Sequence, residues 1–335
     1  MRILIPSRWP IVALLLLAPS IPELLTGSTP ITELVYSPIY FGFAFAGIVG
    51  LYGGGALLIR EFTAYFHKGW ASVLLLGAAY GIAEEGFAVH TFFETSGQPV
   101  GAFATYGHLA GVDWLWALGL SIFHATYSIA LPILLVGLFY PDVRDRRWLD
   151  RGGVVLTSVV YLFVVVLFAV VVGHGPTPAT FALFLAISLV LIGLAGWVPR
   201  DLLAPRAGPA RVRPWVIALA GSLPFDGWTV LLILSNHPVM PAWAAGLVTV
   251  LVDLLALAIV LRYTGTDQPE WTKFYLAAGM LGVLAVWDVI VEFSVPGILV
   301  VTAVFLYLLY RLHRTMRSRE ASPPAGAVEP PPRTA

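Results

Sequence analysis

Long apolar runs dominate the hydrophobic pattern of this chain, and short polar segments separate them at fairly regular intervals. Each run is about 20 residues long, which is the length of a helix that crosses a bilayer. No run alternates like a barrel strand, and lipid offers no partner to a free backbone amide, so each run predicts a helix. The ten predicted spans cover residues 9–26, 36–58, 70–92, 114–138, 153–173, 179–198, 214–235, 241–261, 274–292 and 296–312.

The composition leads to the same fold class. The 335 residues are 59% hydrophobic and 11% charged, whereas a soluble domain is roughly one quarter charged. We therefore predict an all-α, polytopic transmembrane helical bundle in the cell membrane, with the lipid bilayer as its main partner. The formal net charge is zero, so the charge balance predicts no nucleic-acid partner. Cysteine is absent, which excludes disulfides, thiolate metal sites and a cysteine nucleophile.

The positive charges are distributed unevenly between the loops. If the N-terminus lies inside and each run crosses the membrane once, all 19 Lys and Arg residues lie at the inner side. Cytoplasmic loops carry such an excess of positive charge. The pattern therefore predicts ten spans with both termini cytoplasmic. One alternative stays open for residues 1–26, which form either a retained helix or a cleaved signal peptide after Arg2 and Arg8.

Two polar segments divide or end the predicted bundle. Residues 200–213 form a basic inner loop that separates spans one to six from spans seven to ten. Residues 322–335 are rich in proline, and such a composition predicts a disordered cytoplasmic tail. The sequence therefore predicts a transmembrane helical domain over residues 1–321.

Ionisable side chains inside the predicted spans are candidate functional groups, because a charge in lipid is costly. No Lys or Arg lies deep inside any predicted span, so ordinary ion pairs do not explain the buried acids. Each acid is then expected to be protonated, to share a proton, to bind a cation or to pair with histidine. The candidates are Glu84, Glu85, His124, Asp226, Asp253 and Asp288.

Glu84 and His124 occupy similar predicted depths in two consecutive antiparallel spans. At ~1.5 Å per residue, Glu84 lies about 12 Å and His124 about 15 Å from the outer ends of their helices. Tyr80 shares a helix face with Glu84, and Ser128 shares one with His124. Because adjacent residues diverge by ~100° on an α-helix, Glu84 and Glu85 are not expected to face one site equally, and we favour Glu84.

The Glu84–Glu85 pair and the later His124 distantly resemble the CAAX-protease and bacteriocin-processing (Abi-type) intramembrane proteases. That family carries Glu-Glu-x-x-x-Arg, then Phe-x-x-x-His, then His-x-x-x-Asn. This chain has Val89 at the arginine position and Ser128 four residues after His124. The resemblance implies an intramembrane hydrolase that uses these two glutamates and this histidine. The strings YGGGALLIREF and LLGAAYGIAEEGF also resemble uncharacterised bacterial multi-pass membrane proteins, which implies no activity.

We favour a proton- or cation-coupled transporter or permease with an outward-biased intramembrane site. Glu84 would be its main protonation site, with His124 as a relay or ligand. The transported solute or ion is not identified by the sequence. The candidate catalytic residues are Glu84, Glu85 and His124, and the candidate substrate- or ion-binding residues are Tyr80, Ser128, Asp226, Asp253 and Asp288.

Two alternatives leave open whether the chain is an enzyme. In a glutamate/His-dependent intramembrane hydrolase, Glu84 or Glu85 would activate water, alone or through a divalent metal, with His124 as ligand or oxyanion donor. A metal cofactor is expected only under this alternative. In a non-catalytic membrane component, protonated acids would form hydrogen bonds between helices.

Overall fold

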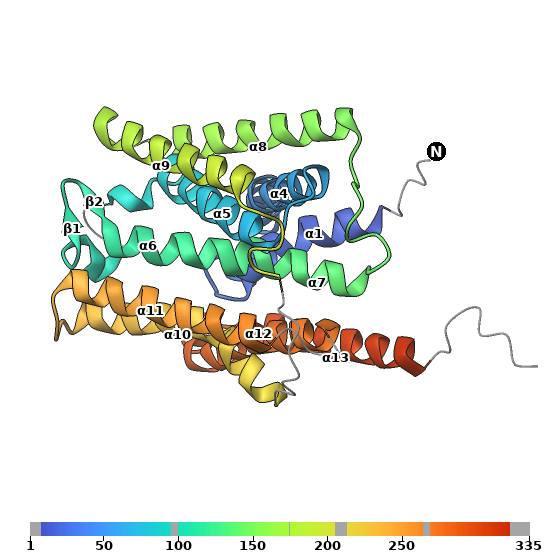
Figure 1. Cartoon of the computed structure of the whole chain (residues 1–335). Helices are drawn as coiled ribbons and strands as arrows, with labels where there is room; N and C mark the ends of the chain where they lie inside the picture. The colour runs from blue at the N-terminus through green and yellow to red at the C-terminus, as the bar shows by residue number, and fades with distance from the viewer. Residues whose placement is uncertain (1–7, 95–99, 174, 205–212, 264–268, 322–335) are drawn as a thin grey trace, which may run out of the picture.

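A computed structural model describes residues 8–94, 100–173, 175–204, 213–263 and 269–321. Most of the predicted basic loop, residues 205–212, and the predicted tail, residues 322–335, lie outside the described residues. The described part is a bundle of long helices whose axes run in similar directions (Figure 1). The all-α fold class predicted from the sequence is therefore confirmed.

The first half of the chain contains spans that change from α-helical to π-helical geometry. The π-helical segments are η1 (Ser20–Leu24), η2 (Val49–Gly53), η3 (Ile82–Ala88) and η6 (His124–Ala130). They join or extend the α-helices α1 (Trp9–Pro19), α3 (Pro38–Ile48), α4 (Gly54–Tyr65), α5 (Trp70–Gly81), α6 (Trp114–Phe123) and α7 (Leu131–Phe139). The short α2 (Glu33–Tyr36) precedes α3, and α8 (Arg151–Val172) and α9 (Pro178–Trp197) complete this half.

The second half of the chain consists of four long helices. They are α10 (Pro214–Asn236), α11 (Ala242–Tyr263), α12 (Pro269–Val291) and α13 (Ile298–Ala321). α10 and α12 approach so closely that a Cβ atom at Gly221 would overlap the carbonyl oxygen of Leu276, and one at Gly279 would overlap that of Ala218. The glycines thus bring the two backbones into contact, as small residues do in membrane helix pairs.

One hydrophobic core joins the two halves. α10 and α12 pack against α6 and α7 of the first half. The core contains Leu120 and Leu134 from these first-half helices, together with Leu231 and Leu281 from α10 and α12. The two halves, which the basic loop separates in the sequence, are therefore held together by apolar packing.

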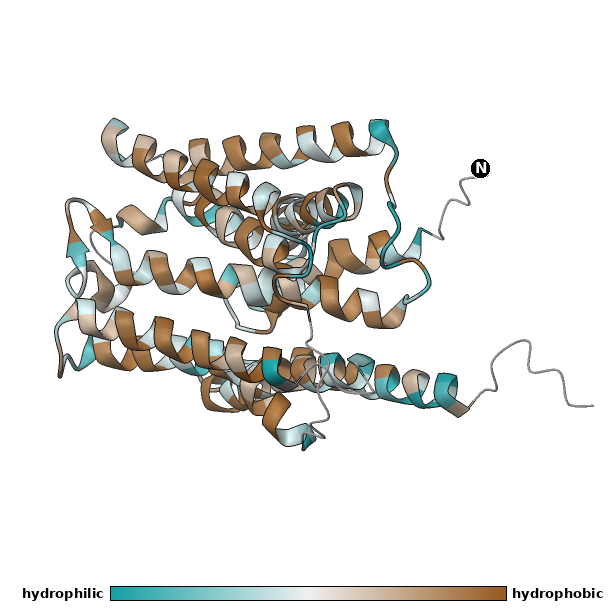
Figure 2. Cartoon of the chain, viewed as in Figure 1, coloured by the Kyte–Doolittle hydropathy of each residue, from teal (hydrophilic) through white to brown (hydrophobic). Residues whose placement is uncertain are grey.

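Nine helices of the described part are long and apolar enough to cross a membrane. The first predicted span instead forms a shorter apolar helix, Trp9–Leu24. Hydrophobic residues predominate along the long helices (Figure 2), and many large ones are exposed. On α8, for example, Phe163 is 63% exposed and Val170 is 71% exposed. Such a large apolar surface needs lipid around it, so the chain is an integral multi-pass membrane protein.

The start of α1 and the end of α13 lie at the same end of the bundle, and a small hairpin lies at the opposite end (Figure 1). The hairpin pairs β1 (His108–Leu109) with β2 (Val112–Asp113) and follows the short 3₁₀ turns η4 (Thr91–Phe93) and η5 (Gly101–Ala104).

Burial raises the pKa of Asp113, and the contact of 2.6 Å with His108 Nδ1 opposes this shift. The cytoplasmic location of the termini stays a prediction from the charge pattern.

Candidate functional site

Glu84, Glu85 and His124 come together in the interior of the first half. His124 Nε2 lies 3.0 Å from Glu85 Oε1, and His124 Nδ1 lies 3.3 Å from Glu84 Oε2. The three residues are 3%, 8% and 2% exposed, respectively. One oxygen or nitrogen atom from each lies within 4.8 Å of the others. We call these three residues the Glu–Glu–His centre.

Both glutamates reach the histidine, although α-helical spacing predicted that they would not face one site equally. The reason is the local helix geometry, because both residues lie in the π-helical segment η3. A π turn holds more residues than an α turn, so neighbouring side chains diverge by a smaller angle. Glu85, which the α-helical spacing ranked below Glu84, therefore contacts His124 as well.

Hydrogen bonds hold Glu85 more firmly than Glu84. Thr91 Oγ1 donates to Glu85 Oε2, and the indole N–H of Trp116 donates to Thr91 Oγ1 over 3.0 Å. Glu84 Oε2, by contrast, makes no hydrogen bond among the described residues, and its contact is the one of 3.3 Å with His124 Nδ1. A buried carboxylate oxygen without a donor is unusual and is suited to accept a proton or to bind a ligand.

Ser128 and Tyr80 lie where the helical spacing placed them, next to the histidine and the glutamate. Ser128 Oγ is 2.9 Å from His124 Nδ1, one turn away in η6. The rings of Tyr80 and His124 are 6.0 Å apart. The buried Tyr80 hydroxyl lies near Glu84 but makes no hydrogen bond of standard geometry in the part of the chain that the structure describes.

Two further residues that the sequence analysis did not select extend the centre. The Tyr52 hydroxyl donates to Glu23 Oε1 over 2.6 Å, and the Tyr52 ring lies 5.9 Å from that of His124. Thr29 Oγ1 donates to Glu23 Oε2 over 2.7 Å. Glu23 is itself an acid inside the first predicted span, so the rule applied to the other spans would have found it. Nothing in the pattern around Tyr52 distinguishes it from an ordinary packed tyrosine.

All four π-helical segments supply residues to this region. Glu23 comes from η1 and Tyr52 from η2, while η3 carries both glutamates of the centre and η6 carries His124. π turns are rare and are often found at functional sites, because the extra residue changes the direction of side chains. Their convergence at one place indicates that the centre is built by the backbone as well as by the side chains.

The three aspartates predicted to bind substrate or ions lie outside the centre, in the second half of the chain. Asp226 Oδ2 accepts a hydrogen bond of 2.7 Å from Ser222, one turn earlier in α10. Asp288 accepts a hydrogen bond from Thr302 of α13. Neither carboxylate oxygen of Asp253 in α11 has a partner within the described ranges. None of them belongs to the cluster around His124.

The donor atoms of the Glu–Glu–His centre fit two kinds of chemistry. Two carboxylates on either side of an imidazole share and transfer protons readily. The same atoms are also suitable ligands for a divalent transition metal, and three protein ligands leave a coordination position for water. Glu84 Oε2 is free of hydrogen bonds within the described part of the chain and fits the role of a ligand.

Comparison with known proteins gives no independent assignment of the chain. No protein-family model matches it, and no curated protein or solved structure is significantly similar to it. Its function is therefore inferred from the residues of the centre and their geometry.

Proposed function

We propose that this membrane protein is a glutamate/His-dependent intramembrane hydrolase that acts at the Glu–Glu–His centre. The observation that carries the proposal is the short distance from His124 to both Glu84 and Glu85, 3.3 and 3.0 Å. A nucleophilic water needs a base and an acid close to one reacting bond, and the contacts of His124 with both glutamates support a site of this kind.

The different hydrogen bonding of the two glutamates suggests a division of roles. Glu84 is the general base, because its Oε2 atom has no other hydrogen-bond partner in the described part of the chain. Glu85 is a positioning residue, since it is fixed by Thr91 and contacts the far nitrogen of His124. His124 is the acid that protonates the leaving group.

The proton transfers of the proposed reaction need only Glu84, His124 and one water molecule. Glu84 takes a proton from water, and the hydroxide attacks the carbonyl carbon of an amide bond. Protonated His124 then gives a proton to the leaving nitrogen as the C–N bond breaks. The proton held by Glu84 returns to His124 across the 3.3 Å contact, which restores both groups. If a divalent metal is bound, Glu84, Glu85 and His124 would hold it, and it would lower the pKa of the bound water.

The proposal is tested by looking for cleavage that depends on Glu84. Purified protein in liposomes is mixed with labelled membrane proteins, and new peptide termini are identified by mass spectrometry. We expect the wild type to produce new peptide termini and Glu84→Gln to produce at least about 100-fold fewer. Glu33→Gln should produce as many as the wild type. Glu33 lies at the start of α2 and is the matched control for removal of a carboxylate. Equal cleavage by Glu84→Gln and wild type, or no cleavage by folded wild-type protein, would overturn the proposal.

A proton- or cation-coupled transporter is the second candidate, and Asp253 is the residue that favours it. Both carboxylate oxygens of Asp253 are buried without a hydrogen-bond partner in the described segments, as expected for a group that takes up a cation. α11, which carries Asp253, packs against α10, which carries Asp226. Liposomes containing a pH-sensitive dye distinguish the candidates. A wild-type transporter would move protons across the liposome membrane, and the Asp253→Asn variant would lose this activity. A hydrolase would move no protons in either form.

A further inference from the structure

A second candidate site lies at the end of the bundle that carries the basic segments. It is a cavity of about 350 Å³ between the α4–α5 turn, α7, the segment before α8, the segment after α9, and α12. No residue of the Glu–Glu–His centre lines it. A volume of this size lies within the range of small-molecule sites in proteins.

The walls of this cavity, which we call the basic cavity, are of two kinds. Its lining combines apolar side chains with five cations and two aspartates. The apolar part includes Trp70, Val73, Ile133, Leu134 and Leu138. The charged part consists of Arg60, Lys68, Arg144, Arg200, Lys273, Asp145 and Asp201. The cations outnumber the acids, so the cavity suits a ligand with an anionic and an apolar portion.

Three of the five cations have carboxylate partners. Arg144 and Lys273 both bind Glu270, over 2.6 and 2.9 Å. Arg60 pairs with Glu61. These partners reduce the positive charge that is available to a ligand, and they fix the positions of the three cationic side chains.

The other two cations, Lys68 and Arg200, have no carboxylate partner among the described residues. Lys68 Nζ donates to the backbone carbonyl of Val198 over 3.1 Å. The two cations come from segments that touch, because a Cβ atom at Gly69 would overlap the carbonyl oxygen of Arg200. The structure therefore places two cations without a carboxylate ion pair, among the described residues, on adjoining segments that line one cavity.

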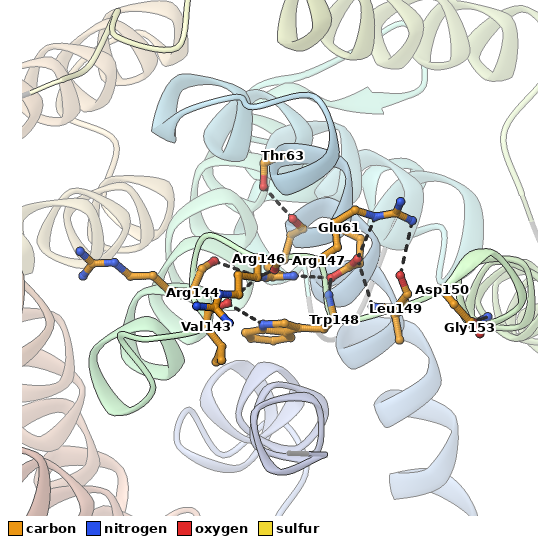
Figure 3. A network of polar contacts seen from close by, with 11 residues as sticks. Glu61, Thr63, Val143, Arg144, Arg146, Arg147, Trp148, Leu149, Asp150 and Gly153 are labelled. Atoms are coloured by element: carbon orange, nitrogen blue, oxygen red, sulfur yellow. Dashed lines mark hydrogen bonds and ion pairs between the residues drawn. The ribbon is translucent and has the colours of Figure 1, made fainter. Parts of the chain in front are cut away.

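A polar network holds the cavity-lining residues Arg60, Arg144 and Trp148 (Figure 3). Glu61 accepts hydrogen bonds from the backbone N–H groups of Trp148 and Leu149, over 2.9 and 3.2 Å. The guanidinium of Arg60 lies 3.7 Å from the centroid of the Trp148 ring and donates to the carbonyl of Arg144 over 2.8 Å. The segment before α8 is therefore fixed to α4, so the cavity has a preformed wall.

We propose that the basic cavity binds the phosphate headgroup of an anionic phospholipid. Lys68 and Arg200 contact the phosphate, and the upper part of an acyl chain lies on the apolar wall around Trp70 and Leu134. Basic pockets between membrane helices recognise lipid headgroups in this way, and Arg and Lys both bind phosphate strongly. The site is independent of the proposed hydrolase centre.

Native mass spectrometry of the purified full chain with added phosphatidylglycerol tests the proposal. We expect one tightly retained lipid on the wild type and at least about tenfold weaker retention on the double variant Lys68→Gln/Arg200→Gln. The matched control is Arg146→Gln/Arg317→Gln, which removes two exposed cations that do not line the cavity. The control should retain the lipid like the wild type.

Two further ligands separate the possible sources of the phosphate group. Phosphatidylcholine, whose headgroup has no net charge, should bind at least about tenfold more weakly than phosphatidylglycerol. Inorganic phosphate alone should not protect the protein from thermal unfolding. Equal lipid retention by both double variants would overturn the site. If inorganic phosphate protects the wild type from thermal unfolding but not the Lys68→Gln/Arg200→Gln variant, and no lipid is retained, the ligand of the cavity is not a lipid. Gel filtration and circular dichroism verify that each variant is folded.

Discussion

His124 Nε2 lies 3.0 Å from Glu85 Oε1, although the two residues are 39 positions apart in the chain. This contact joins the α5–η3 span to the α6–η6 span at the level of the centre. Because Glu85 is also held by Thr91, the imidazole is fixed from outside its own helix. The positions of both groups therefore depend on Thr91 of η4, the short turn that follows η3.

Thr91→Val should weaken both the centre and the fold. The change removes the donor to Glu85 and leaves the indole N–H of Trp116 without its acceptor. We expect a loss of about 1–2 kcal/mol in the free energy of unfolding and slower cleavage, measured by chemical unfolding and by the product assay. Thr91→Ser keeps the hydroxyl and is the control. A Thr91→Val protein that matches Thr91→Ser in both measurements would refute this role.

Tyr52 and Glu23 should be energetically coupled. Their hydrogen bond of 2.6 Å links η2 to η1 beside the histidine ring. A double-mutant cycle with Tyr52→Phe and Glu23→Gln should give a coupling of about 1–3 kcal/mol in unfolding free energy. Tyr36→Phe in place of Tyr52→Phe is the control, since the Tyr36 side chain is 80% exposed. Additive effects of Tyr52→Phe and Glu23→Gln would show that the bond contributes nothing to stability.

The contact between α10 and α12 should not tolerate a methyl group at Gly279. A Cβ atom there would overlap the carbonyl oxygen and other backbone atoms of Ala218, so one backbone would have to shift. We expect Gly279→Ala to cost about 3 kcal/mol or more of stability, or to prevent assembly. Gly282→Ala lies in the same helix, where a Cβ meets no atom within 4 Å, and should have little effect. Similar unfolding curves for the two variants would contradict the close approach.

Glu292 should make the stability of the protein depend on pH below neutrality. The backbone N–H groups of Gly297 and Leu299 bind its carboxylate over 2.9 and 3.0 Å and hold its pKa below the ordinary value. The stabilisation is therefore complete above the unfolded-state pKa, about 4.3, and is lost as the pH falls through the lower folded-state pKa.

Thermal unfolding of wild type and Glu292→Gln between pH 7 and pH 3 tests this relation. At pH 7 the variant should melt at a lower temperature, because it weakens the cap of α13. Towards pH 3 the two curves should approach each other. A difference that stays constant over this range would mean that the carboxylate charge does not stabilise the helix start.

Much of the fold follows from the apolar pattern alone. Nine predicted spans correspond to long apolar helices, because a run such as residues 153–173 has no other way to satisfy its backbone in lipid. The first span was less predictable. Its prolines, Pro19 and Pro22, lie where the helix changes to the π-helical η1, and it forms a shorter helix than expected.

The candidate site was only partly predictable from the sequence. Similar depths in consecutive spans placed Glu84 and His124 together, and α-helical spacing placed Ser128 beside His124. The same spacing ranked Glu85 below Glu84, because nothing in the residue pattern reveals a π turn. Tyr52 was missed since its proximity to His124 depends on tertiary packing, which no local pattern records.

The four π-helical segments also restrict insertions and deletions in the helices that contain them. Losing one residue within η3 or η6 would favour ordinary α geometry and rotate everything after it by ~100° relative to everything before it. Glu84 or His124 would then point towards a neighbouring helix or the lipid. Insertions and deletions in these spans should therefore be far rarer during evolution than in the connections, while substitutions that keep the register are accepted.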